Sequence, residues 1–118
     1  MNLQTLAQLD VERVRADSLA VVEPDLSDYR QAVPEWKVVD RNGNPALQRT
    51  YRFKNFEQAL AFTNRVGALA ELADHHPAIL TEWGRVTVTW WTHVIHNLHR
   101  NDFILAARTD QAFDVSRP

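Results

Sequence analysis

The segment between residues 56 and 73 constrains the fold of this chain more than any other. Apolar side chains recur there every three or four residues, at Phe56, Ala59, Phe62, Val66, Leu69 and Ala73. This spacing predicts a long amphipathic helix, whose apolar face must be covered by another layer of the protein. Pro77 disfavours helical geometry at the residue before it, so we expect the helix to end near His76.

Strand patterns precede this helix. Residues 36–40 and 47–53 are rich in β-forming and alternating side chains, and Asn42-Gly43 lies between them. This dipeptide favours the positive backbone angles of a tight reversal. We therefore predict a β-hairpin.

A second pair of strands is predicted around Gly84. Apolar Val86, Val88 and Trp90 alternate with Thr87, Thr89 and Trp91, which is the period of a strand with two different faces. No charge interrupts residues 86–91, and such a strand would be an aggregation hazard if it were left open. We therefore expect residues 86–91 to form a sheet edge that pairs with a second copy of the chain.

The order of these elements defines the fold class. Helical spacing is also found at residues 24–31, ahead of Pro34, and at residues 102–113. Helix, two strands, long helix, two strands and final helix predict an α+β fold, an antiparallel four-stranded sheet with helices packed on one face. Residues 1–23 are interpreted as an N-terminal extension that could hold a short helix, and residues 24–118 as the folded domain.

Composition narrows the possible functions. At 118 residues and 45% hydrophobic the chain is one domain, and its net charge of -2 gives no basic excess for nucleic acid. There is no cysteine, which excludes disulfides and thiolate metal sites. Residues 1–20 carry acidic side chains where a signal peptide needs an apolar centre, and no run is long enough to span a membrane. We expect a cytoplasmic protein with no nucleic-acid or membrane partner.

Ionisable side chains gather in one stretch of sequence after the long helix. His75 and His76 adjoin Pro77, and His93 follows the strand-like run. Imidazoles titrate near neutral pH, so this concentration indicates an acid–base enzyme.

The same stretch resembles the signature of the pterin-4a-carbinolamine dehydratase family. That signature is an acidic residue, three spacers, His-His-Pro, a short gap, an aromatic residue, nine spacers, His and a later Asp. The chain fills each slot, with Glu71, His75, His76, Pro77, Trp83, His93 and Asp102. The similarity runs from about residue 26 to residue 109, and residues 51–64 and 98–103 resemble the bacterial members that accompany a phenylalanine hydroxylase.

The resemblance implies dehydration of 4a-hydroxytetrahydropterin to quinonoid dihydropterin, which recycles the cofactor of aromatic amino acid hydroxylation. It implies His75 and His93 as the acid–base pair and His76 in substrate binding and electrostatics. Asp102 would hold a histidine tautomer, and the substrate-binding residues would be Glu71, Trp36, Trp83 and Pro77. Two imidazoles can move both protons, so neither a metal nor an organic cofactor is expected, the pterin being the substrate. The family also implies homodimers or homotetramers, with the hydroxylase as functional partner.

Each of these assignments has a structural alternative. Asp102 lies near a helix start, where a carboxylate stabilises free amides without any catalytic role. Glu71 could be a solvated helix residue, and the tryptophans could belong to the core or an interface. Some relatives serve as non-catalytic dimerisation or assembly cofactors with the same fold.

Metal binding is the competing interpretation of the histidines. His93, His96 and His99 recur every third residue and, with His75 and His76, could supply nitrogen ligands for zinc. Adjacent histidines rarely point at one ion, and no acidic residue stands at a recognisable ligand spacing. We therefore expect no metal site.

The start of the last helix departs from the family pattern. Many relatives carry Ser or Thr there, whereas this chain has His99. We expect Asn97 to accommodate the turn and Asn101 to replace the missing N-cap by starting the helix later.

Overall fold

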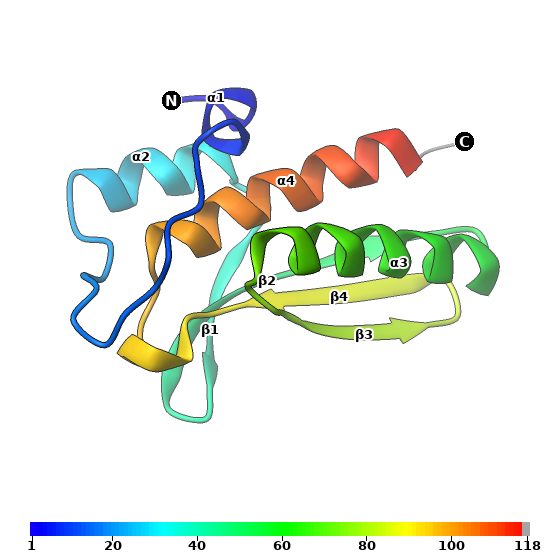
Figure 1. Cartoon of the computed structure of the whole chain (residues 1–118). Coiled ribbons are helices and arrows are strands. Elements are labelled where there is room, and N and C mark those ends of the chain that lie inside the picture. Colours follow the sequence, from blue (N-terminus) through cyan, green and yellow to red (C-terminus); the bar gives the residue numbers. More distant parts are fainter. Residues whose placement is uncertain (117–118) are drawn as a thin grey trace.

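The computed structural model describes residues 1–116, which form a sheet covered by helices on one face (Figure 1). The antiparallel sheet has the strand order β1-β2-β4-β3. Its strands are β1 (Lys37–Arg41), β2 (Asn44–Arg52), β3 (Ala78–Glu82) and β4 (Arg85–Trp90). The predicted α+β class and the four-stranded sheet are confirmed.

The expectation that residues 86–91 form a sheet edge is wrong. β4 lies inside the sheet, where Val88 is paired with Arg49 of β2 on one side and Ile79 of β3 on the other. This position explains why residues 86–90 of β4 carry no charge, because the backbone of the strand is paired on both sides within the chain and Val86, Val88 and Trp90 are buried. The edges are β1 and β3.

The helices follow the predicted order. They are α1 (Leu3–Ala7), α2 (Asp25–Ala32), α3 (Phe56–Ala73), the short 3-10 helix η1 (His93–Ile95) and α4 (Arg100–Ser116). The bounds of α3 coincide with the predicted helix. Asn55 caps its start by accepting a hydrogen bond from the Gln58 amide at 2.9 Å, and it ends at Asp74, which has a left-handed φ of 50°.

Two glycine turns join the strands. Asn42 and Gly43 both have positive φ, 52° and 87°, as the predicted hairpin requires. Gly84 turns β3 into β4 with φ 75°, and a Cβ there would lie 3.2 Å from the Phe53 carbonyl oxygen. Its own carbonyl accepts a hydrogen bond from the Phe53 amide at 2.9 Å, which brings the ends of β2 and β4 together.

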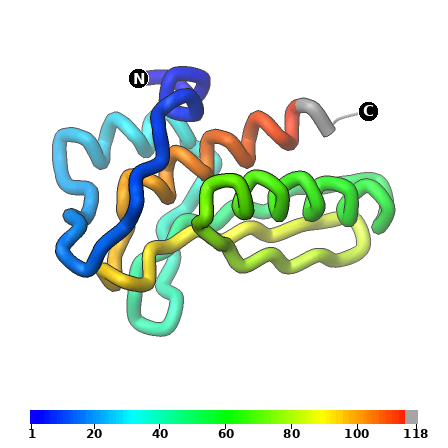
Figure 2. The backbone as a smooth tube through the Cα atoms, in the orientation of Figure 1, coloured from blue at the N-terminus to red at the C-terminus, as the bar shows by residue number. Residues whose placement is uncertain are grey.

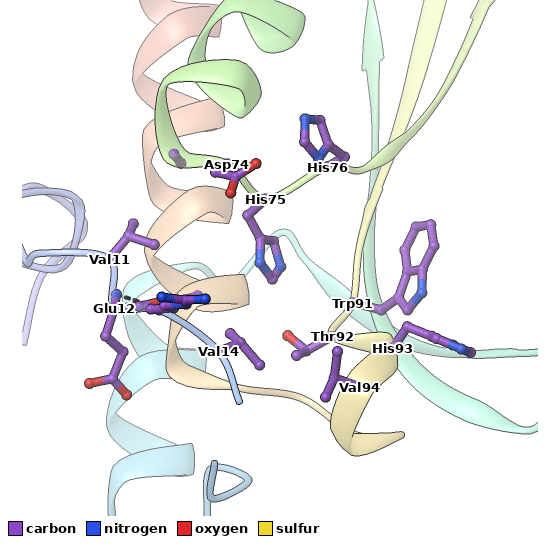
Figure 3. Close-up of a pocket in the computed structure, with 13 residues that line it drawn as sticks. Val11, Glu12, Val14, Asp74, His75, His76, Trp91, Thr92, His93 and Val94 are labelled. Carbon is purple, nitrogen blue, oxygen red and sulfur yellow. Dashed lines mark hydrogen bonds between the residues drawn. The ribbon is translucent and has the colours of Figure 1, made fainter. Parts of the chain in front are cut away.

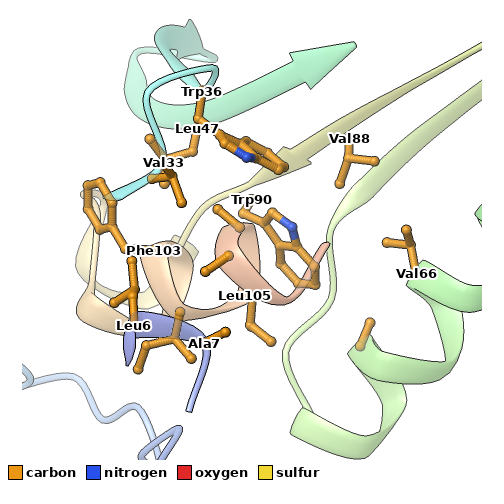
Figure 4. Close-up of a cluster of buried hydrophobic side chains, with 14 of the residues drawn as sticks. Leu6, Ala7, Val33, Trp36, Leu47, Val66, Val88, Trp90, Phe103 and Leu105 are labelled. Carbon is orange, nitrogen blue, oxygen red and sulfur yellow. The ribbon is translucent and has the colours of Figure 1, made fainter. Parts of the chain in front are cut away.

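The core lies between the sheet and the helices (Figure 4). Trp90 of β4 and Leu47 of β2 meet Phe103 and Leu105 of α4, and Val66 of α3 closes the other side. These side chains are buried, so the two helices and the sheet depend on one shared apolar cluster.

A buried carboxylate ties α4 to the sheet. Asp110 Oδ1 accepts hydrogen bonds from the Trp36 indole at 3.0 Å, from Arg49 at 2.7 Å and from the Tyr51 hydroxyl. Burial raises the pKa of Asp110 against the opposing effect of these donors, and burial together with Asp110 raises the pKa of Tyr51. Nothing in the sequence pattern indicated this cluster.

The N-terminal segment is packed against the domain. Leu6 of α1 is buried, and Arg108 of α4 donates to the carbonyl oxygens of Ala7 and Leu9 at 2.9 and 2.7 Å. In Figure 2 the segment runs beside α4 before the chain turns into α2. No helix among the described residues is long and apolar enough to cross a membrane.

Candidate active site

A pocket of about 750 Å³ lies where the end of α3, the segment after β4, the start of α4 and residues 11–14 meet (Figure 3). All three predicted catalytic histidines, His75, His76 and His93, line it. The remaining lining residues are Val11, Glu12, Arg13, Val14, Ala73, Asp74, Trp91, Thr92, Val94 and Asn101. Local sequence explains the placement of the histidines, because α3 ends at Ala73 with Asp74 as its C-cap, and His75 and His76 follow outside regular secondary structure.

His75 is paired with Asp102. Its Nε2 lies 2.8 Å from Asp102 Oδ1, and its ring stacks on Trp90 with a centroid distance of 6.0 Å. Against an ionised carboxylate, which only accepts hydrogen bonds, Nε2 must carry a proton. This leaves Nδ1 of His75 as the nitrogen available to exchange a proton.

Asp102 is fully buried and its second oxygen is also occupied. Oδ2 accepts from the Thr92 hydroxyl at 2.6 Å and from the His99 amide at 2.9 Å. Three donors therefore surround this carboxylate, which fixes its position against His75. Asp102 also lies in the first turn of α4, so capping and support of His75 are combined in one side chain.

His76 points away from this pair, as Figure 3 shows. Its Nε2 lies 2.6 Å from Glu71 Oε2, and both side chains are exposed. Glu71 thus contacts a pocket histidine without lining the pocket itself.

His93 opens η1 on the opposite side of the pocket. Its ring packs edge-on against His96 at a centroid distance of 5.3 Å, and Trp91 beside it lies under the Arg41 guanidinium at 4.2 Å. Trp91 and His93 also line a neighbouring cavity of about 640 Å³ next to the β1–β2 turn. Trp91 was not among the residues predicted from the sequence, although its position beside His93 was a usable signal.

None of the four predicted substrate-binding residues lines this pocket, although Glu71 contacts His76 at its edge. Trp36 is buried in the core beside Tyr51, where its indole donates to Asp110, and it is closed off from a bound ligand. Trp83 lies in the turn between β3 and β4 with 74% of its surface exposed. Pro77 follows His76 and is not a lining residue.

The start of α4 corrects the predicted cap. His99, not Asn101, caps the helix, because its ring Nδ1 accepts a hydrogen bond from the Asn101 amide at 3.0 Å. The left-handed residue in the preceding turn is His96, with φ 54°, and not Asn97. His99 Nε2 lies 3.1 Å from Glu12 Oε1, so the neutral ring with its proton on Nε2 satisfies both contacts. Burial lowers the pKa of His99 and favours this form.

Asn101 has a different role. Its side-chain oxygen accepts from the Glu12 amide at 3.0 Å, and its amide group donates to the Glu12 carbonyl at 2.6 Å. Glu12 was not predicted as a site residue. Its partner Asn101 lies 89 positions away in sequence, so no local pattern indicated the contact.

The histidines considered as possible zinc ligands do not form a metal site among the described residues. Among residues 1–116 the structure brings no three His, Asp or Glu side chains into an arrangement that could hold an ion. His99 is directed to Glu12 and Asn101, and His76 to Glu71.

Fold and pocket together define a small α+β protein with an imidazole–carboxylate pair set among further histidines. Residues 20–112 match the family model described as pterin 4 alpha carbinolamine dehydratase, and the chain belongs to that family.

The chain resembles solved structures, including the following two. A transcriptional coactivator/pterin dehydratase from Brucella melitensis is 28% identical with a TM-score of 0.71, covering 80% of this chain and 98% of the other. A pterin dehydratase-like protein identified as a RuBisCO assembly factor in the alpha-carboxysome is 25% identical with a TM-score of 0.57, covering 66% and 88%.

Proposed function

We propose that this protein dehydrates 4a-hydroxytetrahydropterin to quinonoid dihydropterin and thereby recycles the pterin cofactor of an aromatic amino acid hydroxylase. The observation that carries the proposal is the pairing of His75 with the buried Asp102 in a pocket that His76 and His93 also line. Family membership supports the choice of a pterin as substrate.

The reaction needs two proton transfers and no redox change. A proton goes to the hydroxyl at the 4a carbon, the carbon–oxygen bond breaks, and the adjacent ring nitrogen loses a proton as its double bond to that carbon forms. One imidazolium and one neutral imidazole perform both steps near pH 7, so the proposed reaction requires neither a metal nor an organic cofactor.

The two imidazoles are His75 and His93. Asp102 fixes the tautomer of His75, stabilises its charged form and leaves Nδ1 for exchange. His76 is more exposed and is held by Glu71, which suits binding and electrostatics better than proton transfer.

A dehydration assay with chemically generated 4a-hydroxytetrahydropterin tests the proposal. The purified protein should accelerate water loss well above the spontaneous rate, and zinc measured on the same sample should be far below one ion per chain. Failure to accelerate the reaction, or a stoichiometric metal on which the rate depends, would contradict the proposal.

The second candidate is a non-catalytic role as a dimerisation or assembly cofactor. The similarity to a protein identified as a RuBisCO assembly factor favours keeping it. A binding-only protein has no need of a pocket histidine paired with a buried carboxylate that accepts from three donors, which is the physical reason to prefer the enzyme. Absence of dehydration, combined with recovery of a stable partner complex, would favour this second role.

A further inference from the structure

We propose that residues 11–14, which precede the region matched by the family model, form a substrate-contacting wall of the active site. We further propose that Asn101 is the positioning residue that holds this wall. The inference rests on the proposed function, because the ligand of the wall is taken to be the same reduced pterin. It adds a determinant of binding that the histidine signature does not contain.

The wall is part of the pocket by geometry. Val11, Glu12, Arg13 and Val14 all line it. Figure 3 shows Val11 and Glu12 on one side of His75, and Trp91 and His93 on the other. A ligand that reaches both His75 and His93 is therefore bounded on its remaining side by this segment.

The wall is held in place by contacts of Glu12 with α4 and the residue before it. The Glu12 backbone donates to and accepts from the Asn101 side chain, at 3.0 and 2.6 Å. The Glu12 carboxylate reaches the His99 ring at 3.1 Å and Arg100 at 3.4 Å. One residue of the segment thus makes four contacts to the first turn of α4, the turn that also carries Asp102.

The segment is anchored at both ends as well. Upstream, Arg108 holds the carbonyl oxygens of Ala7 and Leu9, and downstream the Val21 amide donates to the Leu98 carbonyl at 3.0 Å. A wall preorganised in this way does not have to be ordered when the ligand binds, which favours affinity.

The chemistry of the wall indicates what it contacts. Val11 packs on the core, whereas Val14 is half-buried and lies outside the core cluster, so its side chain is available to a ligand. No titratable group among residues 11–14 is needed for the two proton transfers. We therefore assign the wall to apolar contact with the reduced pterin ring, so that it acts on substrate binding and not on the chemical step.

The first test replaces a wall residue with a larger side chain that would occupy part of the pocket. Val14→Trp should raise KM for the 4a-hydroxytetrahydropterin, and Kd for 7,8-dihydropterin, by at least about tenfold, with kcat changed far less. The matched control is Leu19→Trp, which adds the same side chain at an exposed position that lies after the wall and does not line the pocket. Unchanged KM and Kd in a folded Val14→Trp protein would overturn the inference.

Asn101→Leu tests the positioning role with a side chain of similar size that cannot bond to Glu12. Amide hydrogen exchange at residues 11–14 should become faster, and KM and Kd should rise more than kcat falls. Faster exchange with unchanged KM and Kd would show that the wall does not contact the ligand, and unchanged exchange would show that Asn101 does not hold it.

The controls separate this inference from the proposed function. If the wild-type protein binds 7,8-dihydropterin without dehydrating the carbinolamine, the enzymatic proposal fails while Kd still decides the role of the wall. A wild-type protein that neither binds nor dehydrates would overturn both. Full activity of the wild type with no effect of Val14→Trp overturns the wall alone.

Discussion

Asp102 has two roles, one in supporting His75 and one at the start of α4. One oxygen faces His75 and the other accepts from Thr92 and the His99 amide, so the carboxylate supports a histidine while it completes the start of α4. The two roles weighed from the sequence are therefore not exclusive. A change at this position must be designed to keep the helix while it alters the histidine.

Asp102→Asn is such a change. It keeps the shape and one oxygen, but the neutral amide no longer stabilises a charged His75 or enforces its tautomer. We expect kcat to fall by roughly 10² or more with the fold retained, judged by circular dichroism and thermal melting. Turnover near that of the wild type would show that Asp102 serves the helix only.

His93 and His76 are expected to differ in kinetics. His93→Ala removes a proton-transfer group, so kcat should drop by about two to four decades. His76→Ala removes an exposed binding group and should raise KM more than it lowers kcat. Steady-state kinetics on both variants decides the matter, and a loss confined to kcat in His76→Ala would reverse the roles.

We expect His99 to make the stability of the protein depend on pH. Burial lowers its pKa, the charges of Glu12 and Asp102 oppose this, and His75 and Arg100 reinforce it. The unfolded chain therefore binds a proton at His99 more readily than the folded protein does. The contribution of neutral His99 to folding stability is fully present above the ordinary histidine pKa of about 6.5, and it is lost as the pH falls through the lower pKa of His99 in the folded protein. Protonation of Nδ1 also removes the acceptor that caps α4.

The corresponding measurement is urea unfolding between pH 7.5 and pH 5. The wild-type free energy of unfolding should decline as the pH falls. His99→Ser keeps an N-cap oxygen but does not titrate, so its decline over the same range should be smaller. Equal declines in the two proteins would mean that other groups control the pH dependence.

At the level of elements, local signals were sufficient where neighbours in sequence decide the structure. The period of residues 56–73 predicted α3, and Asn42-Gly43 predicted the hairpin turn, because periodicity and backbone angles are local properties. The strand order was not local. The uncharged residues 86–90 of β4 have a pattern that fits an edge strand and an interior strand equally well, and only the pairing of β4 with β3 distinguishes the two.

The same distinction applies to the site. The histidine spacing predicted three residues that do share one pocket, since they flank one strand pair and its turn. Trp36 was placed in the site by resemblance, yet its indole is needed by Asp110 in the core. Glu12 and Asn101 meet only through tertiary packing, so no spacing could reveal them.

The Asp110 cluster connects α4 to β2, and its loss should weaken both elements. Asp110→Ala leaves the buried Trp36 and Tyr51 donors without their acceptor, which we expect to cost at least about 2 kcal/mol of unfolding free energy. Asp110→Asn keeps the accepting oxygen and should be milder, because burial already disfavours the charged form. Chemical denaturation of the two variants tests this, and an equal loss in both would mean that the charge matters more than the hydrogen bonds.

At the scale of the whole molecule, the strand order changes where a second copy could pair. The available edges are β1 and β3, with β4 enclosed between β2 and β3. β1 carries Lys37, Asp40 and Arg41, charges of the kind that protect an open edge. β3 has its only charge at its last residue, Glu82, and its central Leu80 is 57% exposed. We therefore expect self-association to use β3.

Leu80→Lys tests this edge. In an antiparallel pairing about a two-fold axis near the strand centre, each lysine meets its own copy, so the repulsion and the lost apolar contact act on the same interface from both subunits. We expect a homodimer to dissociate to monomer, measured by sedimentation equilibrium over a range of concentrations. The matched variant is Val38→Lys on β1, which is also exposed but lies on the other edge and should leave the mass unchanged. Dissociation in Val38→Lys but not in Leu80→Lys would show that the interface is at β1. Unchanged mass in both folded variants would show that association does not use the sheet edges.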